Sequence, residues 1–234
     1  MCVDDLVSGD TWDWVTPMSL VSLVVGKRRS FEARRALGIA IVEHGLRQGL
    51  LTIGDVRDDF VPWEFADVNE AVARAEAETY REESASGIWF GFWMDRTVAG
   101  WRRGYSLMAR KDRTTRLELD AVERVIRKGL KGPVWGEEVV EEWQRAEREF
   151  NARPHDPRRP GPSLYDLMMA GLQQEWFEVG EMGPHGTFRK LDPKRAREGH
   201  YAEGIQFGNL GIRITKDGAA RAREVGGKTG GSRP

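Results

Sequence analysis

Apolar residues recur at every third or fourth position in several stretches of this chain, which is the spacing of a helix that buries one face. The clearest such stripe predicts a helix over residues 31–48, ended by Gly49, and comprises Ala33, Ala36, Leu37, Ala40, Ile41 and Gly45. Asp67, followed three residues later by Glu70, has the pattern of an N-cap and predicts a helix that reaches about Arg81. Similar stripes predict helices over residues 119–130, 135–150 and 164–172.

Short apolar runs between these stripes predict strands. The strand-like segments are Leu50–Thr52, Ile88–Met94, Phe177–Val179 and Leu210–Ile214, the last together with Ile205 and Phe207. Ile53–Val56 is expected to open a second short helix or a turn. Thr97 and Thr215 are expected to cap the helices that follow them, and Pro193 is expected to begin a short helix that ends near Arg197 or Glu198. The predicted fold class is therefore mainly α with short β-strands, an α+β protein.

The chain contains an internal repeat. Ile41–Val56 aligns without a gap on Leu167–Met182, and most of the remaining positions keep their apolar or polar character. Further along, GIWFG at 87–91 returns as GIQFG at 204–208, and a Thr-x-x-Gly segment follows each copy. The identical pairs in the aligned segments are Gly45 with Gly171, Leu46 with Leu172, Gln48 with Gln174 and Gly54 with Gly180. The repeat predicts one structural module that is used twice.

Two modules of about 70 residues each lie near the lower limit of independent stability, so a shared interface or a bridging helix is expected. The two stripes between the copies predict a helical pair in this role, and the four prolines at 154–162 predict a stiff linker. The predicted segments are an N-terminal segment over 1–32 that packs on module 1, module 1 over 33–104, a helical connector over 105–150, a Pro-rich linker over 151–162, module 2 over 163–225 and a disordered tail over 226–234.

The order of predicted elements resembles that of winged helix-turn-helix proteins. The resemblance covers residues 33–104 and 164–224 and rests on a helix, a short strand, TIGDV opening a second helix, a third helix, a strand region and Thr-x-x-Gly. It implies two related winged-helix-like modules in tandem. It also implies that the third helix of a module enters the major groove of DNA.

Charge is unevenly divided along the chain, although the net charge is −1. Residues 183–234 carry 11 Lys and Arg against 5 Asp and Glu, which leaves 25 against 32 for residues 1–182. Arg and Lys neutralise phosphates, so the basic cluster of module 2 is the candidate nucleic-acid-binding site. Its members are Arg189, Lys190, Lys194, Arg195 and Arg197. Solvated surface charge is the alternative explanation. The helix from Asp67 is acidic and would repel phosphates.

Tryptophans gather around the first GIxFG copy and are absent from the matching positions of the second. They are candidates for contact with another protein, and core packing is the simpler alternative. The candidates are Trp63, Trp89, Trp93 and Trp101.

No pattern predicts a catalytic residue, a metal site or a cofactor. The four histidines, His44, His155, His185 and His200, lack metal-ligand spacing, and no Gly-x-Ser-x-Gly motif occurs. The single cysteine, Cys2, excludes an intramolecular disulfide and favours a reducing cytoplasm. The most apolar run, Val15–Val25, has roughly half the length of a membrane span and lacks the charges of a signal peptide. No membrane partner is expected.

These observations favour a non-enzymatic binding protein, a regulator or adaptor that contacts double-stranded DNA through the basic cluster of module 2. The alternative is a protein-interaction module, such as an inhibitor or immunity-type partner that never touches nucleic acid. An enzyme without a recognisable motif is the third function considered. By analogy with other regulators, a homodimer is compatible with the first function.

Overall fold

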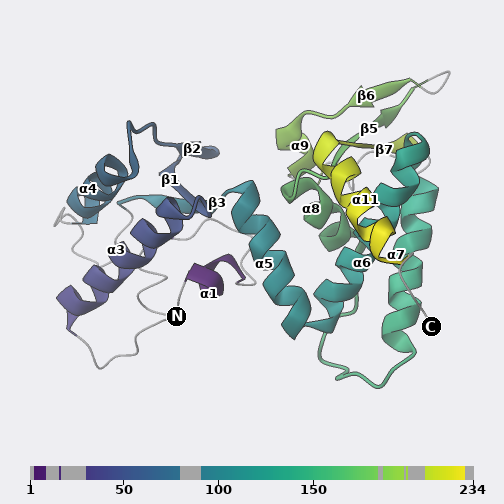
Figure 1. The fold of residues 1–234 in the computed structure, drawn as a ribbon, viewed down its shortest axis with the longest axis horizontal. Coiled ribbons are helices and arrows are strands. Elements are labelled where there is room, and N and C mark those ends of the chain that lie inside the picture. Colours follow the sequence, from purple (N-terminus) through teal and green to yellow (C-terminus); the bar gives the residue numbers. More distant parts are fainter. Residues whose placement is uncertain are drawn as a thin grey trace. The chain divides into compact units, whose positions relative to one another are not determined.

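The computed structural model describes residues 3–8, 16, 30–79, 91–183, 187–197, 199 and 209–229. Helices predominate and the strands are short, so the protein is of mixed α and β class, as predicted (Figure 1). The chain divides into two compact units, residues 1–107 and 108–234, and the boundary falls within helix α5 (Val98–Lys111). Among the helices that the structure describes, none is long and apolar enough to span a bilayer.

The first unit is built around a three-stranded antiparallel sheet with the strand order β2-β1-β3. Helix α4 contacts α3, and α1 contacts α3 as well (Figure 1). Val7 of α1, Val42 of α3, Ile53 of β1 and Ala75 of α4 share one hydrophobic core. The elements before α5 are α1 (Val3–Val7), α3 (Phe31–Arg47), β1 (Leu51–Val56), β2 (Phe60–Pro62), α4 (Val68–Thr79) and β3 (Trp93–Arg96).

The second unit contains a four-stranded antiparallel sheet with the order β4-β7-β5-β6. The predicted helical pair forms α6 and α7, which contact each other, and α6 also contacts α8 and α11. Val125 and Ile126 of α6 are fully buried, so the pair contributes to the core of this unit. Its elements after α5 are α6 (Arg113–Lys128), η2 (Gly129–Lys131), β4 (Val134–Trp135), α7 (Gly136–Asn151), α8 (Leu164–Gln173), β5 (Phe177–Met182), β6 (Phe188–Lys190), α9 (Pro193–Arg197), β7 (Leu210–Ile214) and α11 (Lys216–Thr229).

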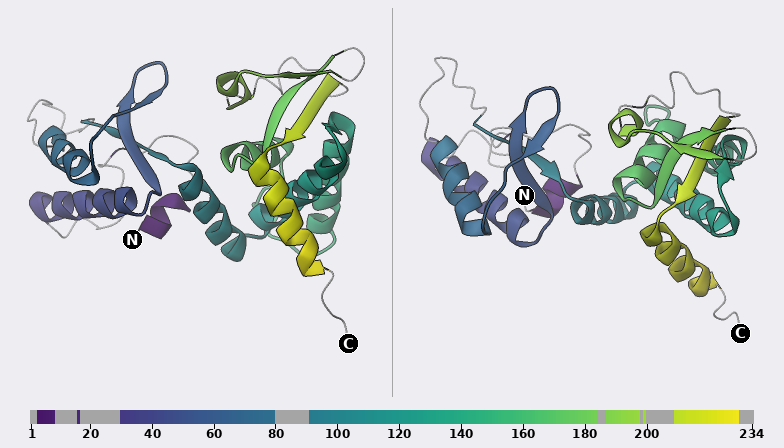
Figure 2. Two further views of the ribbon diagram at one scale, coloured as in Figure 1. Left: turned by 45° about the horizontal axis from the view of Figure 1, so that its top comes forward. Right: turned by 90° about the horizontal axis from the view of Figure 1, so that it is seen from above.

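The same order of elements occurs in both units. Helix, hairpin, helix, strand and helix follow one another as α3, β1–β2, α4, β3 and α5, and again as α8, β5–β6, α9, β7 and α11. Figure 2 shows the two hairpins, blue in the first unit and green in the second. The strand registers agree as well. The central glycines pair as Gly54 with Pro62 and Trp93, and as Gly180 with Lys190 and Gly211.

Both predicted threonine caps are confirmed. The hydroxyl of Thr97 accepts a hydrogen bond from the Gly100 N–H at 3.1 Å, and that of Thr215 accepts one from the Gly218 N–H at 3.0 Å. The Thr97 hydroxyl also donates to Gly49 O, in the turn between α3 and β1, and the Thr215 hydroxyl donates to Glu175 O, in the turn between α8 and β5. A Cβ on either glycine would lie about 2 Å from a backbone carbonyl oxygen, so only glycine fits these two positions.

Two other predicted helix starts are also present. The Asp67 carboxylate accepts a hydrogen bond from the Glu70 N–H at 2.9 Å, just before α4 begins at Val68. Pro193 is the first residue of α9, where its missing N–H leaves no helical hydrogen bond unmade. Helix α4 is described as far as Thr79, so its predicted end near Arg81 lies outside the described residues.

The prediction that the alanines of the first long helix lie on its buried face is wrong. Ala33, Ala36 and Ala40 are exposed, whereas Ile39 and Val42 of α3 lie in the core. Alanine fits either face because it loses little on exposure, so spacing alone does not show which stripe contacts the sheet. Packing against β1, α1 and α4 places the branched side chains inside.

Three other expectations need correction. Ile53–Val56 do not open a helix, because they continue strand β1 between β2 and β3. The strand predicted over 88–94 begins at Trp93 within the part of the chain that is described. Gly226–Thr229 belong to α11, so the predicted disordered tail is wrong for these four residues. Residues 87–90 and 204–208 of the GIxFG copies lie outside the described residues.

Candidate functional site

The predicted basic cluster is divided between two consecutive elements of the second unit. Arg189 and Lys190 lie on β6, the second strand of a hairpin, and Lys194, Arg195 and Arg197 follow on the single turn of α9. Only Leu191 and Asp192 separate the two elements. All five residues are therefore within one short stretch that begins on the edge strand β6, where Arg189 and Lys190, as consecutive strand residues, point to opposite faces of the sheet.

Carboxylates on the neighbouring strand neutralise part of this cluster. Arg189 is paired with Glu181, its cross-strand partner, and Lys190 donates to Glu178 at 2.7 Å. Both basic side chains stay in contact with solvent, with 80% and 46% of their side-chain surface exposed. Exposed ion pairs of this kind stabilise a fold by at most about 1 kcal/mol, so their partners exchange at little cost.

Glu178 is shared between two cations from opposite sides of its strand. Lys190 approaches it from β6, and Arg213 of β7 donates to its other oxygen at 2.8 Å. The hydrogen bonds from Lys190 and Arg213 hold the pKa of Glu178 below its ordinary value. The three side chains together carry one net positive charge.

An aromatic ring extends this face of the sheet. Gly180 and Gly211 are cross-strand partners, and the ring of Phe188 lies against both of them. The Arg213 guanidinium lies 4.7 Å from the centre of the Phe188 ring, within range of a cation–π interaction. The result is a surface on which cations lie beside an aromatic ring and two glycines.

Helix α9 provides the rest of the basic cluster. Its Arg195 is exposed and makes no ion pair with another described residue. Ala196 is buried and anchors the turn. Lys194 and Arg197 are placed by the backbone of the same turn.

The tryptophan candidates do not form a single surface. Trp93 pairs with Gly54 of β1. The backbone N–H of Trp63 donates instead to the carbonyl of Ile53, the residue before Gly54. Side chains of adjacent strand residues point to opposite faces, so Trp63 and Trp93 lie on opposite faces of the sheet. Trp101, on α5, stacks with Arg96 at 4.2 Å. Trp89 lies outside the described residues.

Trp63 is a packing residue of the first unit. Its indole N–H donates to Asp55 at 2.8 Å, and its ring contacts Phe65 and Phe92. The Arg74 guanidinium covers the ring at 3.9 Å. The side chain is only partly exposed, and its polar group is already satisfied.

Within the described ranges, no group of three His, Cys, Asp or Glu residues is placed to hold a metal ion. His44 is exposed on α3, and the His155 ring lies 4.4 Å from that of Phe150. His185 and His200 lie outside these ranges.

Comparison of the chain with protein-family models, with curated proteins and with solved structures finds no match in any of the three.

Sequence reasoning did not include Glu178, Glu181 and Arg213 in the site. A signal for Glu178 was present, because Phe177, Glu178 and Val179 alternate apolar and polar residues as a half-buried strand does, whereas Glu181 breaks that alternation. The partnership of Arg213 with Glu178 had no local signal, since the two residues are 35 positions apart.

Proposed function

We propose that this chain is a non-enzymatic binding protein, a regulator or adaptor that contacts double-stranded DNA through the second unit. One observation supports this function most directly. Five basic residues occupy two consecutive elements, β6 and α9, at one edge of a sheet. Such a cluster attracts phosphates over several ångströms and needs no specific base contact to do so.

The carboxylate partners reduce this attraction but do not cancel it. Glu178 and Glu181 are strand residues whose ion pairs with the basic cluster are exposed to water. Replacing one carboxylate by a phosphate costs little in such a setting, and counterion release from DNA favours the exchange. The proposal rests on this charge distribution and not on the winged-helix order, since TIGDV forms a strand.

Retention of random duplex DNA at two salt concentrations tests the proposal. With all five basic residues in contact with phosphates, binding should weaken about 500-fold between about 50 and 200 mM salt. A variant with the five residues changed to Ser should lose retention at the lower salt concentration. The residues to change are Arg189, Lys190, Lys194, Arg195 and Arg197.

A matched control removes the same number of charges from another exposed part of the second unit. All five positions are exposed in the structure, so their loss should leave the fold intact. The control changes Arg145, Arg148, Arg153, Arg158 and Arg159 to Ser. Equal loss of retention in both variants would show that net charge alone is responsible, and no retention by the native chain would overturn the proposal.

A protein-interaction module, such as an inhibitor or immunity-type partner, is the second candidate function. The ion pairs of Arg189 with Glu181 and of Lys190 with Glu178 favour this candidate, because paired cations attract phosphates less strongly. Leu130 of η2 and Trp135, the second residue of the edge strand β4, expose 43% and 41% of their surface. Exposed aromatic residues of this kind are enriched in protein interfaces. Absence of DNA retention at low salt would favour this candidate.

A further inference from the structure

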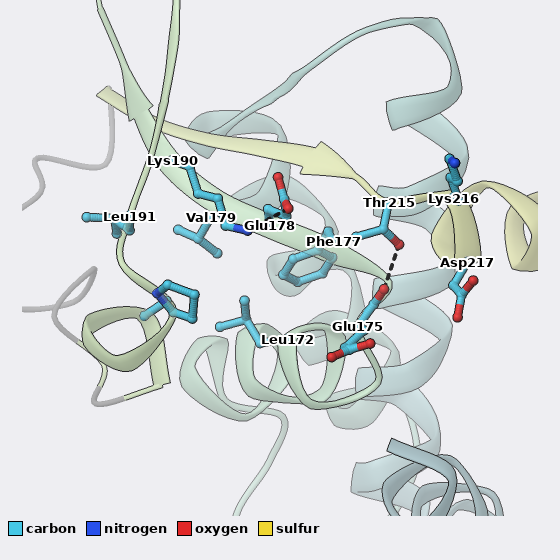
Figure 3. A pocket seen from close by; sticks show the side chains of 12 residues that line it. Leu172, Glu175, Phe177, Glu178, Val179, Lys190, Leu191, Thr215, Lys216 and Asp217 are labelled. Carbon is cyan, nitrogen blue, oxygen red and sulfur yellow. Dashed lines mark hydrogen bonds and ion pairs between the residues drawn. The ribbon is translucent and has the colours of Figure 1, made fainter. Parts of the chain in front are cut away.

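The second unit contains a cavity of about 470 Å³, lined by residues of α8, β5, β6, α9 and the start of α11. Sites for small organic molecules have about 300 to 1,000 Å³, so this cavity has a suitable size. Figure 3 shows Leu172, Phe177 and Val179 around its centre. The apolar part of the lining comprises Leu172, Phe177, Val179, Leu191, Pro193 and Ala196. These side chains can enclose the apolar part of a ligand.

The charged part of the lining has an excess of negative charge. Its three carboxylates belong to Glu175, Glu178 and Asp217, and its two ammonium groups to Lys190 and Lys216. Glu178 is already neutralised, because Lys190 and Arg213 donate to its two oxygens at 2.7 and 2.8 Å. Two carboxylates of the lining therefore remain against a single lysine.

These two carboxylates lie toward one end of the cavity. In Figure 3, Lys216 and Asp217 point in opposite directions from the start of α11, and Asp217 points to the side on which the Glu175 carboxylate lies. Glu178 and Lys190 lie on the side of the sheet. The cavity thus combines apolar walls with an acidic end.

Glu175 has a backbone conformation that glycine adopts more readily. Its φ is 54°, and Gly49, in the corresponding turn of the first unit, has φ 64°. The turns correspond because the Thr97 hydroxyl donates to Gly49 O and the Thr215 hydroxyl to Glu175 O. The Glu175 side chain is exposed and makes no ion pair within the described part of the chain. No ion pair among these residues therefore offsets the backbone strain.

We propose that this cavity binds a small organic amine, with its ammonium group beside the Glu175 carboxylate and its apolar body against Leu172 and Phe177. A carboxylate or a phosphate would be repelled at the acidic end, and an uncharged group would leave that end without a counter-charge. The site goes beyond DNA binding and does not depend on it, because none of the five residues of the basic cluster holds the ammonium group.

Three probes with the same aromatic body test the proposal on the full chain, namely 2-phenylethylamine, 2-phenylethanol and phenylacetate. At neutral pH only the first is a cation and only the third is an anion. Titration followed by two-dimensional NMR of the backbone amides gives a Kd for each probe. At low salt the amine should bind up to about fivefold more tightly than the alcohol, which is the contribution of one exposed ion pair.

Phenylacetate should bind more weakly than both other probes. Equal binding of the amine and the alcohol would mean that the apolar walls act alone, and it would overturn the proposal. Stronger binding of phenylacetate than of the amine, or no binding of any probe, would overturn it as well.

The signals that move locate the site. Saturating 2-phenylethylamine should shift the backbone amide signals of Leu172, Phe177 and Leu191, which line the cavity. Shifts confined to the exposed Leu130 and Trp135 would contradict the assignment of the amine to this cavity.

Glu175→Gln tests the residue that is proposed to hold the ammonium group. The variant should bind the amine no more tightly than the alcohol, and its affinity for the alcohol should stay that of the native chain. Glu137→Gln removes the same charge from an exposed position of α7 and should leave both affinities unchanged. Equal loss in the two variants would attribute the effect to net charge and contradict the role of Glu175.

Glu175→Gly separates binding from folding. Because glycine relieves the backbone strain, this variant should melt at a higher temperature than the native chain. It should nevertheless lose the preference for the amine over the alcohol. A Glu175→Gly variant that keeps this preference would overturn the assignment of the ammonium group to Glu175.

Discussion

Glu118 of α6 accepts a hydrogen bond at 3.1 Å from the backbone N–H of Ser163, the residue that caps α8. Only 6% of Glu118 is exposed. Burial, together with the carboxylates of Asp166 and Asp112, raises the pKa of Glu118 from 4.5 to about 8, although the Ser163 N–H opposes this. The buried carboxyl therefore holds its proton near neutral pH, and it lies where the Pro-rich segment ends.

This pKa predicts how stability depends on pH. Between about pH 4.5 and 8 the folded chain holds a proton on Glu118 that the unfolded chain has lost. The free energy of unfolding therefore falls as pH rises through this window. Because one pKa unit corresponds to about 1.4 kcal/mol, the loss amounts to a few kcal/mol.

Glu118→Gln should remove this part of the pH dependence and stabilise the protein above pH 8. Glutamine keeps an oxygen acceptor for the Ser163 N–H and carries no charge. Urea unfolding at pH 5, 7 and 9 measures the effect, with Glu141→Gln on the exposed face of α7 as control. A variant with the same pH profile as the native chain would contradict the prediction.

The buried ion pair between α6 and α7 gives a second prediction. Arg124 and Glu142 lie 2.6 Å apart with only 12% and 10% of their side chains exposed, and Lys128 also contacts Glu142. Glu142→Gln should cost about 3 kcal/mol, because it leaves a buried guanidinium without its counter-charge. Thermal and urea unfolding measure this loss.

The double variant Arg124→Met with Glu142→Leu should be much less destabilised than Glu142→Gln. One guanidinium nitrogen of Arg124 is buried without a hydrogen-bond partner in the described part of the chain, so an apolar replacement removes this unsatisfied group, and Lys128 keeps Glu141 as a partner. Additive losses in the double variant would contradict this account.

The two threonine caps should contribute equally in the two units. Thr97→Ala and Thr215→Ala each remove an N-cap acceptor and a donor to a turn carbonyl, and each should cost about 1 to 2 kcal/mol. Serine at either position keeps both hydrogen bonds and should restore most of the loss. Chemical unfolding of the four variants tests this, and a neutral effect at one site would show that the two caps differ in energy.

Glu175 has a left-handed backbone conformation with φ 54°, and Gly49 occupies the corresponding turn with φ 64°. A side chain costs about 1 kcal/mol in this region, and nothing lies within 4 Å of a Cβ at Gly49. Gly49→Ala should therefore destabilise through conformation alone, and Glu175→Gly should stabilise by up to about 1 kcal/mol. Differential scanning calorimetry distinguishes the two signs.

Removing the internal carboxylates should strengthen DNA binding. Glu178→Gln with Glu181→Gln releases Arg189, Lys190 and Arg213 from their partners, so affinity at low salt should rise several-fold with a steeper salt dependence. Glu137→Gln with Glu141→Gln changes the net charge equally on α7. An equal gain in this control would attribute the effect to net charge and not to the hairpin.

Much of the local structure was predictable from the sequence, whereas the candidate site was predictable only in part. Arg189 and Lys190 were recognised as basic, but their place on a strand was not, because β6 has three residues and no apolar period of its own. Their carboxylate partners follow from the register of β5 with β6, which the hairpin decides.

The sequence by itself determined that a segment of the chain is repeated, and it determined the helix starts at Thr97, Thr215 and Pro193. These features depend on hydrogen bonds and dihedral angles within a few residues, which local sequence specifies. The tertiary structure alone decided which face of α3 is buried and that Ile53–Val56 form a central strand. It also decided that Glu178 is shared between two strands, because these outcomes depend on contacts between residues far apart in the chain.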